Sequence, residues 1–567
     1  MELPDIKEFM NMNWVEIEPS YGALKTRDLN QGNVEEWLKD WSSLRELISE
    51  RYARLLLATS LDTQDEEVEK SFHIFLEEVY PPAEAADQVL KEKLLASGLA
   101  PDGMEIPLKK MRVKAELFRE ENLPLLTEEH KLGLQYNKVF GAQSVEWEGE
   151  ELTLVQLKSK LQTPERDTRE ELWRLLSDRQ LEDREKVNEI WGKLMDVRLQ
   201  LAENADKKDY RDFSWQQRVR LDYEPADSLQ FVDAVEEVVV PAAARVYDRY
   251  QERMGLERLR PWDVIDNRST MDFPVLEAFE TEDEFTSRVS GIYRKLDPVL
   301  GEYFDLMREE NLLDLVNRQG KGPGAFCTSF PTQKRPFIFM NAVGLATDVR
   351  TLFHESGHAF HFFERTRLPY IHQRHTGLEF GEVASTAMEL LTSRYISEGE
   401  GGFFTEEESA HYHRGHLENK LLFWPYMAVV VAFQHWVYQH HQRASDPTRC
   451  DQKWSELVDR FLPAIDWDDL QDVKETGWQR KLHIHRAPFY YIEYGLSLLG
   501  AVQLWENALD DERDALRRYR QSLGLGGTAS LPDLYAAAGV KFAFDAETLG
   551  SAVDLIEKKL QEFEAVI

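Results

Sequence analysis

Five consecutive residues, His354-Glu355-Ser356-Gly357-His358, have the types and spacing that could build half of a hydrolytic zinc site. On a helix, positions i and i+4 lie on one face, so both imidazoles can reach the same ion. Glu355 directly follows the first histidine and can act on the attacking water without being a ligand, as the H-E-x-x-H pattern requires. The alternative is a surface helix that carries two unrelated histidines. The residues before and after the motif are therefore needed to choose between a zinc site and such a surface helix.

A catalytic zinc site usually takes three protein ligands and leaves one position open. A glycine at position 361 and a histidine at position 364 would complete one class of site, but the chain has His361 and Glu364 there. The third ligand is then expected from a second helix. Glu382, 24 residues after His358, is the best candidate, and Glu379 competes with it. Spacing alone does not separate the two glutamates.

Two further residues fit a site built from two helices. Glu389 lies seven residues beyond Glu382, two turns along the same helix face, and could hydrogen-bond a ligand imidazole from the second shell. Gly357 lies inside the motif helix, where glycine costs about 1 kcal/mol relative to alanine. Such a glycine is expected where another helix or a substrate backbone passes close by.

Composition bounds the partners of this chain of 567 residues. A formal net charge of −35 argues against nucleic acid or an anionic membrane as the main partner, and 42% hydrophobic residues are enough for a substantial core. The two cysteines, Cys327 and Cys450, imply no disulfide framework, and the first residues show no secretory signal. We therefore expect a cytoplasmic protein. The sequence carries no signal for an oligomeric state.

The hydrophobic periodicity predicts helix nearly throughout, as in residues 34–55 and 549–567. A polar break at residues 203–209 suggests an N-terminal helical lobe over residues 1–202 and a catalytic region over residues 203–567. The convincing strand signal is a hairpin, in which residues 325–330 and 336–341 flank a turn-like segment.

A segment downstream of the motif, residues 481–495, is dense in hydrogen-bond donors. It contains His485, Tyr490, Tyr491 and Tyr494. Phenol hydroxyls and a histidine could stabilise the oxyanion that forms when water attacks a carbonyl. Without context, aromatic core packing is the better interpretation of the three tyrosines.

Together these residues resemble the thimet oligopeptidase and oligoendopeptidase F group of zinc peptidases, most closely its oligoendopeptidase F branch. Three blocks carry the resemblance: residues 353–361, residues 380–386 with Glu389, and residues 485–494. Weaker similarity extends to residues 320–341 and to the N-terminal lobe.

The resemblance implies a mainly α-helical, elongated, two-lobed fold with a deep central cleft and a small β-hairpin at the cleft edge. It implies zinc ligation by His354, His358 and Glu382, which settles the competition with Glu379. It also makes Glu355 the general base.

The resemblance further implies that His485, Tyr490 and Tyr494 contact the substrate or the tetrahedral intermediate. The hairpin is similar to the family's cleft-edge strand, where a peptide could add as another strand. One departure concerns the donors, because thimet-like members carry a further tyrosine where this chain has Ser497.

The expected function is zinc-dependent endopeptidase hydrolysis of short, unstructured oligopeptides, with one Zn²⁺ per chain. One alternative is a zinc metallocarboxypeptidase that trims peptide C-termini. It would need a cation for the terminal carboxylate, and Lys334, Arg335 and Arg486 are the candidates. The others are a catalytically inactive peptide-binding protein with a structural zinc and a helical scaffold for protein partners.

Overall fold

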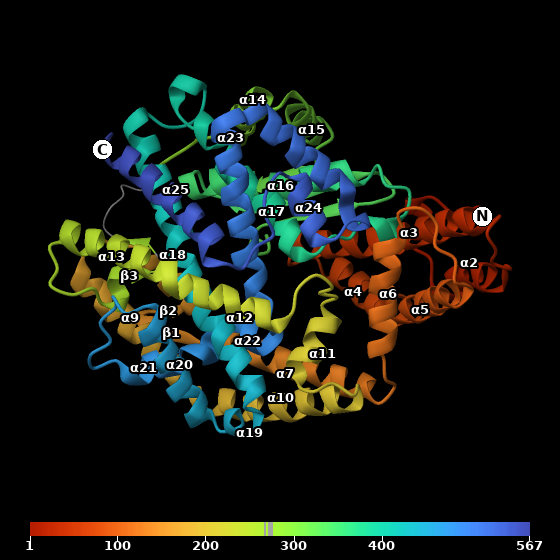
Figure 1. Cartoon of the computed structure of the whole chain (residues 1–567), viewed down its shortest axis with the longest axis horizontal. Helices are drawn as coiled ribbons and strands as arrows, with labels where there is room; N and C mark the ends of the chain where they lie inside the picture. Colours follow the sequence, from red (N-terminus) through yellow and green to blue (C-terminus); the bar gives the residue numbers. More distant parts are fainter. Residues whose placement is uncertain (266–267, 270–275) are drawn as a thin grey trace. The chain divides into compact units, whose positions relative to one another are not determined.

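The computed structural model describes residues 1–265, 268–269 and 276–567. The predicted mainly helical fold with small β elements is confirmed (Figure 1). The chain forms two compact units, and each is assembled from three separate segments. Unit 1 comprises residues 1–115, 275–409 and 500–542, and unit 2 comprises residues 116–274, 410–499 and 543–567. The predicted lobe boundary after residue 202 stays a prediction.

The helices of unit 1 are α1 Ile6–Phe9, α2 Trp14–Thr26, α3 Val34–Leu61, α4 Glu66–Ile74, α5 Tyr80–Ser97, most of α6 Glu105–Leu117, α14 Glu282–Leu296, α15 Pro298–Glu309, α16 Ala346–Arg365, α17 Leu378–Leu391 and α24 Leu531–Ala537. Its N-terminal core is organised around α3. Trp37 and Trp41 of that helix are fully buried, and the indole of Trp41 donates to Asp87 Oδ1 of α5 over 2.7 Å. The predicted apolar stripe of residues 34–55 is therefore a core face.

The sheet of unit 1 has the strand order β5-β7-β6. Strands β6 (Phe326–Phe330) and β7 (Arg335–Ala342) form the predicted antiparallel hairpin, which is confirmed. Strand β5 (Leu313–Val316), which the sequence did not reveal, pairs in parallel with β7. The hairpin turn is fixed to α3, because the buried Glu50 carboxylate accepts hydrogen bonds from Thr332 N and Oγ1 over 2.7 and 2.5 Å. Strand β6 lies at the edge of this sheet.

Helices α16 and α17 lie side by side in unit 1 (Figure 1). A Cβ atom added to Gly357 would lie 2.5 Å from both Ala384 O and Ser385 Cα, so the expectation that another helix passes close to this glycine is confirmed. Asp348 is the third residue of α16, which begins at Ala346. Its carboxylate accepts hydrogen bonds from the backbone amides of Val343 and Leu345 over 2.8 and 2.9 Å.

The helices of unit 2 are α7 Asn122–Gly141, α8 Leu154–Lys160, α9 Arg166–Leu181, α10 Arg184–Asn204, α11 Tyr210–Gln217, α12 Pro225–Ala234, α13 Val240–Met254, α19 His441–Ala444, α20 Pro447–Phe461, α21 Gln471–Glu475, α22 Leu482–Arg486 and α25 Ala546–Glu564. Its strands are β1 Ser144–Trp147 and β2 Glu150–Thr153, which pair, and β3 Val264–Ile265 and β4 Arg268–Ser269, which also pair. Helices α18 (Glu406–Gln439) and α23 (Tyr491–Leu525) contribute to both units.

Helix α18 contains a long apolar stretch. Among the described residues it is the one helix that is long and apolar enough to cross a membrane by length and composition. However, 83% of its apolar window is buried inside the protein, and Trp424 and Phe433 are fully buried. Burial of this kind is the pattern of a core helix.

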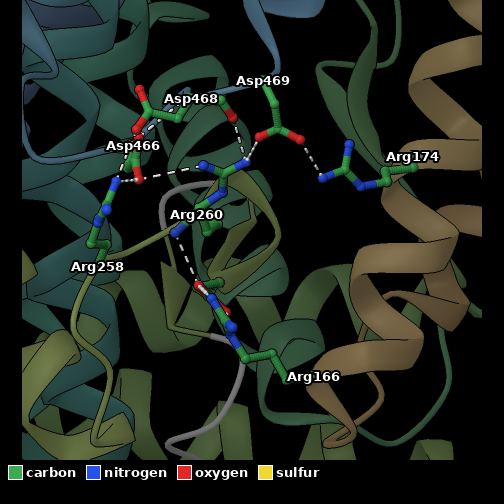
Figure 2. Close-up of polar contacts among 8 residues, drawn as sticks. Arg166, Arg174, Arg258, Arg260, Asp466, Asp468 and Asp469 are labelled. Atoms are coloured by element: carbon green, nitrogen blue, oxygen red, sulfur yellow. Dashed lines mark hydrogen bonds and ion pairs between the residues drawn. The ribbon is translucent and has the colours of Figure 1, made fainter.

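A network of arginines and aspartates in unit 2 ties residues 258–263 to residues 466–469 (Figure 2). Arg258 Nη1 lies 2.9 Å from both Asp466 and Asp468, and Arg260 Nη2 lies 2.5 Å from Asp469 Oδ1. Arg174 of α9 reaches the other carboxylate oxygen of Asp469 over 2.9 Å. Each of these pairs has at least one partner whose side chain is exposed by 61% or more. Exposed ion pairs contribute little to stability, so we regard the network as a local connection between two loops.

Candidate active site

Helices α16 and α17 bring the three predicted metal ligands together. One donor atom each of His354, His358 and Glu382 lies within 4.8 Å of the other two. Glu382 Oε2 is 3.6 Å from His354 Nε2 and 3.9 Å from His358 Nε2. The spacing follows from the helices, since the two histidines are one turn apart on α16 and the glutamate faces them from α17. Two imidazole nitrogens and one carboxylate oxygen form the donor set of an open catalytic zinc site.

Glu389 supports the first of these histidines. Its Oε1 atom lies 2.8 Å from Nδ1 of His354, which leaves Nε2 of that ring to face Glu382. Burial alone would lower the pKa of His354, but the hydrogen bond and the negative charge of Glu389 outweigh it and raise the pKa. Burial lowers the pKa of His358 to about 3, which keeps that ring in the neutral form that binds metals.

Glu355 sits beside the ligands without belonging to the donor set. Its side chain is buried, and burial raises the pKa of its carboxyl to about 7, with the charge of Glu382 adding to the shift against the opposing effect of His354. A carboxylate with a pKa of this size can both accept and return a proton near neutral pH. Position and electrostatics thus suit a general base.

The rival carboxylate, Glu379, lies elsewhere on α17. Its side chain is 3% exposed, and its charge contributes, after burial, to raising the pKa of the Tyr535 phenol. Within the described part of the chain, the side chains that could hold a metal ion together with His354 and His358 include Glu382 and not Glu379. The structure therefore favours the assignment that the resemblance implied.

Tyr490 directly precedes α23 and Tyr494 lies in its first turn, both in unit 2, and their rings are 5.1 Å apart. Both side chains are partly exposed. His483 of α22 joins this pair, since its ring lies 5.7 Å from Tyr490 and 6.1 Å from Tyr494. The cluster thus combines two phenol hydroxyls with an imidazole.

His485 occupies a different environment. It is 1% exposed, and its ring stacks between Tyr136 and Trp478 at centroid distances of 4.3 and 5.8 Å. Its Nδ1 atom lies 3.3 Å from Lys481 O. A direct contact between His485 and a substrate would require this aromatic packing to open, and the role predicted for His485 stays a prediction.

His483 is the residue that the sequence interpretation missed. His483 and His485 are two positions apart on the short helix α22, so their side chains leave the helix in different directions. The direction that faces the tyrosines depends on how α22 packs, which spacing does not reveal. Ser497, the departure from the thimet-like pattern, is 1% exposed, and its hydroxyl donates to Tyr494 O over 3.0 Å.

Comparison with known proteins agrees with this geometry. The model of peptidase family M3 matches residues 159–552, which include the metal-ligand set and the tyrosine cluster. An oligoendopeptidase F homologue of Borreliella burgdorferi is 21% identical over 337 residues, which cover 58% of this chain and 54% of that protein. Oligopeptidase PepF of Bacillus subtilis is 26% identical over 281 residues, which cover 48% of this chain and 40% of that protein. The chain thus matches about half the length of these curated relatives.

Solved structures match over nearly the whole chain. PZ peptidase A, solved with an inhibitor, has a TM-score of 0.84 and 27% identity and covers 99% of this chain and 98% of its own. An oligoendopeptidase F structure from Bacillus anthracis has a TM-score of 0.80 and 25% identity, with 99% and 97% covered. The chain belongs to peptidase family M3, in its oligoendopeptidase F branch.

Proposed function

We propose that this protein is a zinc-dependent endopeptidase that hydrolyses peptide bonds in short, unstructured oligopeptides. The observation that carries the proposal is the convergence of His354, His358 and Glu382, with Glu355 beside them and outside the donor set. Relatives named as oligopeptidases support the substrate class. We also propose a cytoplasmic location, which the two free cysteines support.

The donor set fits Zn²⁺ on its own chemistry. Two nitrogens and one oxygen suit this ion, and the side chains of His354, His358 and Glu382 are exposed to solvent by 29%, 27% and 15%. Zinc bound here would polarise the scissile carbonyl and lower the pKa of the attacking water. Glu389 would hold the His354 ring in the tautomer that presents Nε2 to the ion.

Glu355 carries the proton through the reaction. Its carboxylate accepts a proton from the attacking water and then delivers that proton to the nitrogen of the leaving amine. Tyr490 and Tyr494 supply hydroxyl donors for the oxyanion of the tetrahedral intermediate, as the resemblance implies, and His483 is the histidine that shares their cluster.

Mass spectrometry of products from a mixed peptide library, with and without a chelator, tests the proposal. We expect internal cleavage that chelation abolishes and zinc restores. Release of single C-terminal residues would favour the carboxypeptidase alternative, for which Arg335 is already engaged by both carboxylate oxygens of Glu310 over 2.6 and 2.8 Å. Retention of peptides without any cleavage would identify the protein as a binding protein.

A further inference from the structure

Two residues of unit 2, Val219 and Phe489, have left-handed backbones, with φ of 57° and 62°. This conformation is uncommon for any residue but glycine, and for a β-branched residue such as valine it is a true outlier. Strained backbones persist where the surrounding structure over-determines them, and they gather at functional sites. The two outliers lie on segments that contact each other through two arginines.

Val219 separates Arg218 from Arg220 and turns both guanidinium groups toward residues 488–489. It follows the end of α11, where Val219 N donates to Gln216 O over 2.9 Å and Arg220 N donates to Trp215 O over 3.1 Å. A helix end of this type usually carries glycine at the left-handed position. Because the backbone reverses direction at Val219, the side chains of Arg218 and Arg220 both reach the turn at Pro488 and Phe489.

Side chains hydrogen-bond both backbone carbonyls of the Pro488–Phe489 turn and the amide of Phe489. Arg218 Nε donates to Pro488 O over 2.8 Å, and Arg220 Nη2 donates to Phe489 O over 2.5 Å. The backbone amide of Phe489 donates to Gln434 Oε1. The Phe489 ring is 2% exposed, so the turn is fixed by packing as well.

The same arginines extend to the first turn of α23. Arg220 Nη2 donates to Glu493 Oε1 over 2.7 Å, and Glu493 is 2% exposed. The guanidinium carbon of Arg218 lies 5.3 Å from the centre of the Tyr490 ring. The contacts of Arg218 and Arg220 therefore bracket Tyr490, which directly follows Phe489.

We propose that Arg218 and Arg220 are positioning residues that fix the Pro488–Phe489 turn and thereby the placement of Tyr490 and Tyr494. The inference rests on the proposed donor role of these tyrosines. A donor acts only within a few tenths of an ångström of its required place, so a loosened turn weakens stabilisation of the transition state more than binding of the substrate. Arginine suits the task, because its planar fork binds two acceptors at once and stacks on an aromatic ring.

Steady-state kinetics of Arg218→Ala and Arg218→Lys on a quenched peptide form the first test. We expect kcat to fall about 10-fold or more in Arg218→Ala, with KM nearly unchanged and partial recovery in Arg218→Lys. The matched control is Arg211→Ala in α11, the helix that ends directly before Arg218; its guanidinium pairs with Asp209 over 2.6 Å, and we expect near-normal kcat. A change in KM without a change in kcat, or an equal fall of kcat in Arg211→Ala, would overturn the inference.

A double-mutant cycle and a spectroscopic signal separate positioning from general structural damage. In a Tyr490→Phe background, Arg218→Ala should cost much less in kcat than in the wild type, because its effect acts through the tyrosine. Full additivity would contradict this. In protein carrying 3-fluorotyrosine at position 490, Arg218→Lys should shift the fluorine resonance and Arg211→Lys should not, whereas an unmoved resonance would contradict the contact.

These arms also distinguish the inference from the proposed function. If Tyr490→Phe and Tyr494→Phe keep normal kcat, the donor role fails, and the inferred effect of the arginines on catalysis fails with it. The fluorine resonance then still reports whether Arg218 fixes the ring of Tyr490. If instead the tyrosine variants lose kcat but Arg218→Ala does not, the donor role stands and the positioning inference is wrong.

Discussion

The carboxylate of Glu389 on α17 binds Nδ1 of His354 on α16 over 2.8 Å, so the two helices are joined at the ligand that begins the motif. This contact fixes which ring nitrogen is free. It also couples the candidate metal site to the packing of α16 on α17, which Gly357 makes possible.

Replacement of Glu389 should weaken metal binding without removing a ligand. For Glu389→Leu we expect zinc affinity to fall by about 10- to 100-fold, because the His354 ring loses the partner that orients it. Glu389→Gln should lie between this variant and the wild type, since an amide oxygen can still accept from Nδ1. Competition with a chromophoric chelator measures the affinity, and an unchanged value in Glu389→Leu would contradict the supporting role.

Gly357→Ala should destabilise the protein by about 1–3 kcal/mol, because the new methyl group would meet backbone atoms of Ala384 and Ser385 that cannot move independently. The control is Gly291→Ala in α14, where a Cβ atom meets nothing within 4 Å. That variant should be neutral or stabilising by up to about 1 kcal/mol. Thermal unfolding of both variants tests the difference, and equal midpoints would show that α17 can move away from α16.

Stability should fall as the pH is lowered below about 6.5, the ordinary pKa of histidine. Burial lowers the pKa of His435 and of His485 to about 3 in the folded protein, and both are 1% exposed. Between these values the unfolded chain binds protons that the folded chain does not, so each histidine removes stability as the pH falls from about 6.5 toward 3, at up to about 1.4 kcal/mol per pH unit. Denaturant unfolding from pH 7 to 4.5 measures this slope.

The matching variant is His485→Phe, which keeps an aromatic ring between Tyr136 and Trp478 but cannot titrate. It should unfold with a shallower pH dependence than the wild type. An unchanged slope would mean that His485 does not remain neutral in the folded protein.

The two histidines of α22 should also differ in catalysis. We expect His483→Phe to lower kcat, because His483 shares the cluster of Tyr490 and Tyr494. A folded His485→Phe variant that loses as much kcat would support the substrate contact predicted from the sequence for His485. Normal kcat in His483→Phe would contradict its assignment to the donor cluster.

Local sequence patterns predicted much of this structure, whereas the pairings between distant segments could not be predicted from them. The geometry of His354 and His358 follows from helical periodicity, and the β6–β7 hairpin follows from its turn residues. Strand β5 is four residues long and pairs in parallel with β7 across intervening residues, so no local pattern marks it. The third ligand was ambiguous for a related reason, because Glu379 and Glu382 are separated only by how α17 faces α16.

The central claim is that Glu355 transfers the proton while taking no part in metal binding. Glu355→Gln, produced in a host that lacks the wild-type enzyme, tests it directly, with Glu379→Gln as the matched variant of a carboxylate outside the donor set. Elemental analysis and cleavage of a quenched peptide are measured on the same preparations. We predict one zinc per chain in both variants, normal turnover in Glu379→Gln, and a loss of about 10²- to 10⁴-fold in kcat for Glu355→Gln. Near-normal turnover by zinc-loaded Glu355→Gln would contradict the account.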